Sequence, residues 1–255
     1  MQRTSINDLQ SLFLQMGLKK NQIVLIHTSL ISLGIIEKGV EGVYEALRNI
    51  LGLEATIIVP TFTYSFRKKE TFDINNTPSP KQLGPFCEFI RNLKKSERSH
   101  DPLFSFCANG PMSNLIMKKK SKNCFGQGSV FDNFYKHKIK ILALGLNYST
   151  GITSFIHIEK LSKVPYREDK TFNGISIDNN GVKHKDYAIH FIKNEKFFRT
   201  NTSCRENIGH LLEEQKISKP QNFGSGRHLL IDFSDMVSST LEVLEKNPYC
   251  MLKKI

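Results

Sequence analysis

The first 60 residues contain a strand, a loop, a helix and a second strand, and this order limits the possible folds more than any other feature of the chain. QIVLIH at 22–27 is a short β-branched apolar run, which predicts a buried strand. Apolar side chains recur at helical spacing in 40–52, and Gly52 stands where a helix C-cap is expected. ATIIVP at 55–60 predicts a second strand that ends at a proline. The order predicts a parallel βαβ unit.

The rest of the chain continues to alternate between strand and helix patterns. Asn179, Asn180 and Gly181 predict the turn of a β-hairpin, and the polar, proline-containing stretch 65–82 predicts a long functional or disordered loop. Further strands are predicted at 103–110, 139–146 and 228–234, and helices at 85–95, 111–120, 129–137, 153–163 and 235–248. We expect one α/β domain over 1–255, with a mostly parallel or mixed central sheet flanked by helices and an added β-hairpin region.

Several bulk features exclude classes of protein. The N-terminal 20 residues predict an amphipathic helix and not a signal peptide, because Asp8 interrupts the apolar stretch. No apolar run is long enough to span a bilayer, so we expect no membrane partner. The 5 cysteines are odd in number and form no CxxC pair, which favours a cytoplasmic protein with reduced thiols. The 8 histidines are scattered, so we expect no metal site.

The net charge of +12 leaves three explanations open. The lysines could form a solvated surface with no partner, attract an anionic small substrate such as a nucleotide or coenzyme A, or bind nucleic acid. Aromatic residues do not interleave with the lysines as a single-strand-binding face requires, so nucleic acid is the least favoured partner.

Loops that follow predicted strands carry many hydroxyl and glycine residues. HTSLISLG (27–34), PTFTYSF (60–66) and NYSTG (147–151) each follow a strand. In an open α/β sheet, ligands bind outside the carboxyl ends of the strands, so these loops are expected to build the site.

These loops also belong to an ordered set of motifs. The further segments are FDINNTPSPKQLGPFCEFIR (72–91), ERSHDPLFSFCANG (97–110), FGQGSVFD (125–132) and TSFIHIEKLSKVPYR (153–167). In this order, and over nearly its whole length, the chain resembles the aminoglycoside 3-N-acetyltransferase family. No single motif is decisive, but the ordered set is specific.

The resemblance implies an α/β fold distinct from that of the GNAT acetyltransferases. It also implies an acyl-coenzyme A co-substrate, with acetyl as the default acyl group, and an amine acceptor. The family includes enzymes that acylate nucleotide-linked amino sugars for surface polysaccharides. The sequence leaves the oligomeric state open, with a homodimer as one option.

His157 and Glu159 are the catalytic candidates that the resemblance implies. A neutral histidine can take the proton that an attacking amine must lose, and a carboxylate can orient that histidine. The family usually spaces the pair His-x-x-Glu, whereas here it is His-x-Glu, and alignment on Glu159 puts Ile156 in the histidine position. The two side chains would point about 200° apart in a regular helix. Either the helix begins irregularly or Glu159 is not the partner, and His157 could instead be a hydrogen-bonded helix residue without a catalytic part.

A second departure lies in HDPLFSF (100–106). Antibiotic-modifying members typically carry His where this chain has Asp101 and Phe104. Asp101 could bind the acceptor ammonium and assist catalysis, or it could be a turn residue before Pro102. Arg98 could contact a phosphate of the acceptor or be solvated.

The remaining candidates are binding residues. Hydroxyls and backbone N–H groups at a helix start suit the phosphates or pantetheine of coenzyme A, although ordinary helix capping is the alternative. Phe62 and Tyr64 could stack on an acceptor sugar or base, and core packing is the alternative for Phe62. The expected acyl-coenzyme A contacts are His27, Thr28, Ser29, Ser32, Gly128 and Ser129.

Three functions follow. The first is an N-acyltransferase acting on a nucleotide-linked amino sugar, which the positive charge and the changes at Asp101 and Phe104 favour. The alternative is an aminoglycoside-resistance acetyltransferase of the same family. The third is a basic nucleic-acid-binding protein that has lost catalysis.

Overall fold

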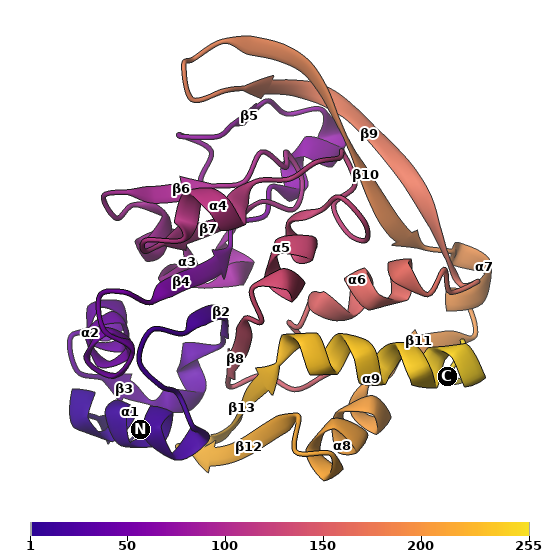
Figure 1. Cartoon of the computed structure of the whole chain (residues 1–255). Coiled ribbons are helices and arrows are strands. Elements are labelled where there is room, and N and C mark those ends of the chain that lie inside the picture. Colours follow the sequence, from indigo (N-terminus) through magenta and orange to yellow (C-terminus); the bar gives the residue numbers. More distant parts are fainter. Residues whose placement is uncertain (1, 255) are drawn as a thin grey trace.

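The computed structural model describes residues 2–254, and a seven-stranded mixed sheet forms its centre (Figure 1). The strand order is β12-β13-β8-β2-β4-β7-β6, in which β8, β2 and β4 are parallel and the outer pairs are antiparallel. The strands are β12 (Ser218–Phe223), β13 (Gly226–Asp232), β8 (Lys140–Leu144), β2 (Ile23–Thr28), β4 (Thr56–Pro60), β7 (Phe106–Asn109) and β6 (Ser96–Arg98). The parallel centre confirms the predicted βαβ unit.

Helices cover both faces of this sheet, and two cores result (Figure 1). Leu25 and Ile58 lie in one core, whereas the neighbouring Val24 and Ile57 lie in the other, as the alternation of a strand requires. On one face lie α1 (Ile6–Met16), α2 (Gly39–Leu51) and α3 (Pro85–Arg91); on the other lie α5 (Val130–Lys136), α6 (Ser154–Leu161) and α9 (Phe233–Lys246). Both faces of the central strands are therefore buried, which explains their continuous apolar sequences.

A long hairpin, β9 (Arg167–Ile177) with β10 (Lys183–Lys193), extends along one side of the molecule (Figure 1). Asp178 begins the turn and accepts the N–H groups of Asn180 and Val182, and Gly181 has a φ of +79°. These contacts confirm the hairpin predicted from the Asn-Asn-Gly sequence.

The predicted loop 65–82 is only partly irregular. The 3₁₀ helix η2 (Tyr64–Lys68) covers its start, and the 3₁₀ helix η3 (Lys81–Leu83) covers its end. Between them, the short strand β5 (Phe72–Asp73) pairs with β9. The smaller elements are β1 (Arg3–Thr4), η1 (Leu30–Leu33), β3 (Ile35–Ile36), α4 (Ser113–Met117), α7 (Glu195–Phe198), β11 (Asn201–Ser203), α8 (Glu206–Glu214) and β14 (Leu252–Lys254).

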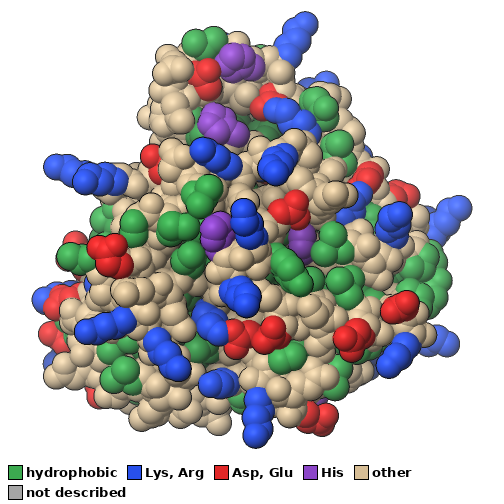
Figure 2. All heavy atoms as spheres, viewed as in Figure 1, with side chains coloured by type: hydrophobic (Ala, Val, Ile, Leu, Met, Phe, Trp, Pro, Cys, Tyr) green, Lys and Arg blue, Asp and Glu red, His purple; other side chains and the backbone are tan. Residues whose placement is uncertain are grey.

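The face of the molecule in Figure 2 shows no single basic patch. Lys and Arg side chains are spread over it, with acidic and apolar side chains between them. Among residues 2–254, no helix is both long and apolar enough to cross a membrane.

Candidate active site

The parallel strands β2, β4 and β8 end at the same edge of the sheet. Thr28 pairs with Leu144 in the β2–β8 register, and the Ser29 N–H donates to the Leu144 carbonyl at 2.7 Å. Gly84, which precedes α3, reaches this edge as well, because a Cβ placed on it would lie 3.6 Å from Thr28 Oγ1. This hydroxyl is buried and has no hydrogen-bond partner in the described part of the chain. Residues from separate motifs therefore meet where the fold class predicts a site.

A cavity of about 720 Å³ opens beside the end of β4. Its walls come from the residues after β4, from η2 and from the loop that leads to η3. Its lining residues are Phe62, Thr63, Tyr64, Ser65, Lys68, Glu70, Thr71, Thr77, Pro78, Ser79, Pro80, Lys81 and Gln82. We call it the strand-end cavity. Sequence reasoning did not single out Lys68, Glu70 or Lys81, and the signal that could have found them was the length and polarity of loop 65–82.

Phe62 and Tyr64, both predicted to contact the acceptor, line the strand-end cavity. Phe62 is also a core residue, since it is buried and its ring lies 4.9 Å from that of Phe104 and 5.3 Å from that of Phe106. Tyr64 is 36 % exposed, and the Arg67 guanidinium lies 5.5 Å from its ring centroid. Tyr64 is thus the more accessible of the two aromatic rings.

Arg98 is buried and not solvated, which corrects one of the two predicted alternatives, and its guanidinium is held by protein oxygens. Its guanidinium is buried and donates to the Thr61 carbonyl at 2.5 Å, the Thr77 carbonyl at 2.6 Å and Ser105 Oγ at 3.0 Å. Burial lowers the pKa of Arg98 to about 10. The side chain joins the end of β4 to loop 74–77 and so supports two walls of the strand-end cavity from behind.

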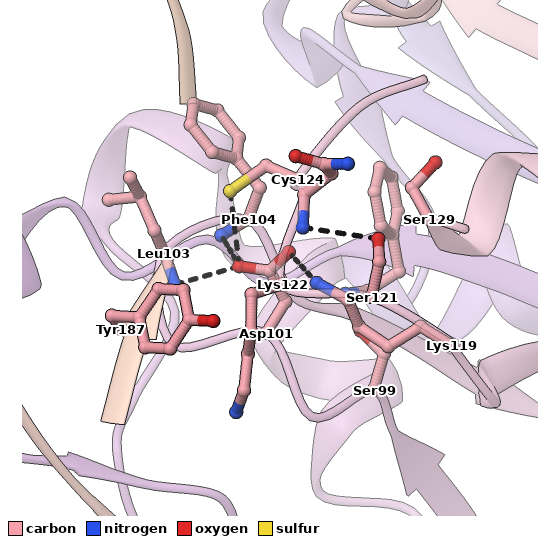
Figure 3. A network of polar contacts seen from close by, with 12 residues as sticks. Ser99, Asp101, Leu103, Phe104, Lys119, Ser121, Lys122, Cys124, Ser129 and Tyr187 are labelled. Carbon is pink, nitrogen blue, oxygen red and sulfur yellow. Dashed lines mark hydrogen bonds and ion pairs between the residues drawn. The ribbon is translucent and has the colours of Figure 1, made fainter. Parts of the chain in front are cut away.

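Asp101 forms a buried network with Lys119, which Figure 3 shows from close by. Lys119 Nζ lies 2.6 Å from Oδ2, and the N–H groups of Leu103 and Phe104 donate to Oδ1 at 3.0 and 2.8 Å. Burial alone would raise the pKa of Asp101, but the Lys119 ammonium and these N–H groups outweigh it and lower the pKa. The carboxylate already holds a cation, so the structure does not favour its predicted role at the acceptor ammonium.

His157 is the fourth residue of α6 and faces α5 and α9. Its Nδ1 accepts the Gly126 N–H at 3.0 Å, and its ring stacks on that of Phe131 at a centroid distance of 4.8 Å. Burial lowers the pKa of His157 to about 3, so the imidazole is neutral and carries its proton on Nε2. A nitrogen that already carries a proton cannot accept one. The geometry favours the alternative of a hydrogen-bonded helix residue, and catalysis by His157 stays a prediction.

Glu159 points to other partners. Its carboxylate lies 2.9 Å from Arg167 Nε, and Arg205 Nη2 and Tyr166 Oη donate to it, each at 3.1 Å. The carboxylate joins α6 to the base of β9 and to the residue before α8. No described contact links Glu159 to His157. α6 begins at Ser154, and its first turn contains a 3₁₀-type hydrogen bond from the Ile156 N–H to the Thr153 carbonyl at 2.9 Å, yet this start does not bring the two side chains together.

The predicted acyl-coenzyme A residues do not form one group. Ser32 Oγ donates to the Ser29 carbonyl at 3.0 Å and packs against Gly145 and Gly226, so it has a structural role. Ser129 Oγ donates to the Gly126 carbonyl at 2.6 Å, and the Gly128 N–H donates to Asp132. Gly128 and Ser129 therefore belong to the turn that leads into α5.

His27 lies at the carboxyl end of β2, next to Thr28. It is buried, and its Nε2 has no hydrogen-bond partner within 2–254. Burial lowers its pKa to about 4. Of the residues predicted to bind acyl-coenzyme A, His27, Thr28, Ser29 and Ser32 lie near the strand-end edge, whereas Gly128 and Ser129 lie at the start of α5. No cluster of three or more metal-ligating side chains is formed by residues 2–254.

Comparison with known proteins identifies the family and the fold. The family model described as aminoglycoside 3-N-acetyltransferase matches residues 25–245. The chain belongs to the aminoglycoside 3-N-acetyltransferase family. This membership confirms the predicted family and its enzyme class, the acyl-coenzyme A-dependent N-acyltransferases.

Two relatives of this family member extend the comparison. An aminoglycoside N(3)-acetyltransferase IV from Salmonella is 26 % identical over 244 residues, which cover 94 % of this chain and 87 % of that protein. A prophage-derived aminoglycoside N(3')-acetyltransferase-like protein from Bacillus subtilis is 28 % identical over 174 residues, which cover 60 % of this chain and 63 % of that protein.

Solved structures confirm the predicted fold class. The apoenzyme of aminoglycoside acetyltransferase AAC(3)-IVa has a TM-score of 0.79 at 23 % identity, covering 98 % of this chain and 92 % of that one. The AAC-IIIb complex with CoASH has a TM-score of 0.81 at 17 % identity, covering 96 % and 97 %.

Proposed function

We propose that this family member transfers an acetyl group from acetyl-coenzyme A to an amine of an aminoglycoside. The strand-end cavity carries the proposal, because it lies at the ligand-binding edge of the sheet and presents side chains of both charges. The named relatives, which are aminoglycoside N(3)-acetyltransferases, support this acceptor over the nucleotide-linked amino sugar favoured from sequence.

The two charges in the strand-end cavity suit the two substrates. Glu70 is the one carboxylate among the lining residues, and it would attract the ammonium groups of an aminoglycoside. Lys68 and Lys81 would attract the phosphates of coenzyme A, and the free hydroxyl of Thr28 would donate to a polar group of the donor at the same edge. Bound CoASH in the AAC-IIIb structure, which shares this fold, supports acyl-coenzyme A as the co-substrate.

The nucleotide-linked amino sugar is kept as a second candidate because two observations favour it. Asp101 is neutralised by Lys119, so it adds no free negative charge for a polycationic acceptor. Lys68 and Lys81 outnumber Glu70 in the strand-end cavity, which suits an acceptor that carries a pyrophosphate.

Steady-state kinetics with thiol detection test the proposed substrate roles. Kanamycin or a nucleotide-linked amino sugar is offered with acetyl-coenzyme A. Glu70→Gln is expected to raise the KM for kanamycin about tenfold, the effect of losing about 1.4 kcal/mol of attraction. Lys68→Ala with Lys81→Ala should raise the KM for acetyl-coenzyme A instead. Lys118→Ala, an exposed lysine that does not line the cavity, is the control. Unchanged KM values in both cavity variants would place the substrates elsewhere.

A further inference from the structure

A second cavity, of about 270 Å³, lies between α5, α6 and α9. Its lining residues are Asp132, Tyr135, His157, Leu161, Val237, Ser238 and Leu241. We call it the helix-layer cavity. It shares no lining residue with the strand-end cavity. Three aromatic rings in contact, those of Phe104, Phe125 and Phe131, separate Phe62 of one cavity from His157 of the other.

The helix-layer cavity contains a hydrogen-bond donor that has no acceptor within the described part of the chain. His157 is 1 % exposed, and its Nδ1 is occupied by the Gly126 N–H, which leaves the proton on Nε2. No hydrogen bond within residues 2–254 reaches Nε2, and Nε2 is not among the fully enclosed unpaired atoms of these residues, so it remains accessible from the cavity. Stacking on Phe131 fixes the ring plane, so the donor cannot turn freely toward a partner elsewhere. The N–H group therefore faces the cavity, where water or the acceptor atom of a bound ligand can pair with it.

The other residues that line the helix-layer cavity determine which kind of acceptor group fits there. Leu161, Val237 and Leu241 supply an apolar wall. Asp132 keeps one oxygen on the Gly128 N–H at 2.8 Å, and its other oxygen has no partner in the described part of the chain. A carboxylate ligand would be repelled by Asp132, whereas a neutral group that both accepts and donates fits the two polar groups.

We propose that the helix-layer cavity binds a small neutral carboxamide carried on an apolar or aromatic body. The carbonyl oxygen accepts the Nε2–H of His157, and the amide N–H donates to Asp132. The apolar body lies against Leu161, Val237 and Leu241. This cavity shares no lining residue with the strand-end cavity, so its occupancy can be measured independently of the proposed function.

Benzamide, which combines an aromatic ring with a primary amide, is the probe. Protein labelled with ¹⁵N-histidine is titrated with benzamide, and the side-chain ¹⁵N signals of His157 are followed by NMR. We expect a saturable shift of the His157 Nε2 signal, with the signals of His27 unchanged. Benzoate, the matched anion, should bind at least about tenfold more weakly because of Asp132.

Two variants separate binding at this site from other effects. Ser238→Trp adds bulk at an exposed position whose hydroxyl lies 3.5 Å from that of Tyr135, and it should abolish the shift without altering His157. Asp132→Asn keeps an oxygen for the Gly128 N–H and should remove the preference for benzamide over benzoate. Lys81→Ala in the strand-end cavity is the control and should leave the binding of benzamide and of benzoate unchanged.

The proposal is overturned if benzamide causes no saturable shift of His157, since water alone would then satisfy its donor. It is also overturned if Ser238→Trp leaves benzamide binding intact, or if benzamide competes with acetyl-coenzyme A.

Discussion

The Gly126 N–H donates to Nδ1 of His157 at 3.0 Å. This hydrogen bond ties the FGQGS turn to α6 and determines which ring nitrogen carries the proton. It makes His157 a hydrogen-bond donor toward the helix-layer cavity, whereas a general base must present a nitrogen that is free to accept a proton.

Replacement of His157 tests its part in catalysis. A general base contributes about 10²–10⁴-fold, whereas loss of this imidazole leaves a buried N–H unpaired at a cost of about 1–3 kcal/mol. We expect His157→Ala to lower the melting temperature and to reduce kcat by less than about 10²-fold. Calorimetry and steady-state kinetics on the same preparation measure both effects. A loss of kcat at or above this level, in protein that remains folded, would restore His157 as the base.

Glu159 is expected to stabilise the fold through its two arginines. Glu159→Gln leaves Arg167 and Arg205 buried without a counter-charge, which should lower the free energy of unfolding by about 3–5 kcal/mol. Glu214→Gln, the same exchange at an exposed position, should change it by less than about 0.5 kcal/mol. Urea unfolding followed by circular dichroism measures both variants. Equal stability of the two variants would contradict the buried network.

The buried Asp101–Lys119 pair leads to a prediction about stability, in which Lys119 is compared with its neighbour Lys118. Lys119→Met leaves the buried carboxylate unpaired and should destabilise the protein by about 3–5 kcal/mol. Lys118→Met removes an exposed charge and should have little effect. If the two variants unfold at the same denaturant concentration, the pair contributes nothing to stability.

Acid should destabilise the protein through its buried histidines. Burial lowers the pKa of His27 to about 4 and the pKa values of His157 and His190 to about 3, from an ordinary value of 6.5. Between pH 6.5 and these values the unfolded chain binds protons that the folded chain does not. Stability is therefore fully present above pH 6.5 and declines as the pH falls toward 3.

Melting temperatures measured from pH 7.5 to pH 4 should show this decline. His157→Asn should flatten it, because one of the three histidines is then absent from the proton balance. A melting temperature that stays constant over this range would contradict the burial of these rings as neutral groups.

The local pattern of the sequence predicted most of the fold. Alternation of Val24, Leu25 and Ile26 between two cores, and the turn at Asp178, follow from short-range rules that a sequence displays directly. The strands β6 and β12 were missed because SER and SKPQNF are polar edge segments without an apolar pattern.

The candidate site was less predictable because its contacts are long-range. Glu159 is bonded to Arg205, which lies 46 positions away, and Asp101 is paired with Lys119, which lies 18 positions away. Motif spacing cannot show which distant cation reaches a carboxylate. The sequence shows which residue types could do this chemistry, while the partners that occupy Asp101, Arg98 and Glu159 depend on the folded chain.

The central claim is acetyl transfer to an aminoglycoside amine, and a competition experiment tests it most directly. The protein is given acetyl-coenzyme A with equal concentrations of kanamycin and a nucleotide-linked amino sugar, and mass spectrometry identifies the acetylated product. The account predicts that kanamycin gains one acetyl group, with an equal amount of free coenzyme A. Acetylation of the nucleotide-linked amino sugar alone, or no acetylated product at all, would contradict it.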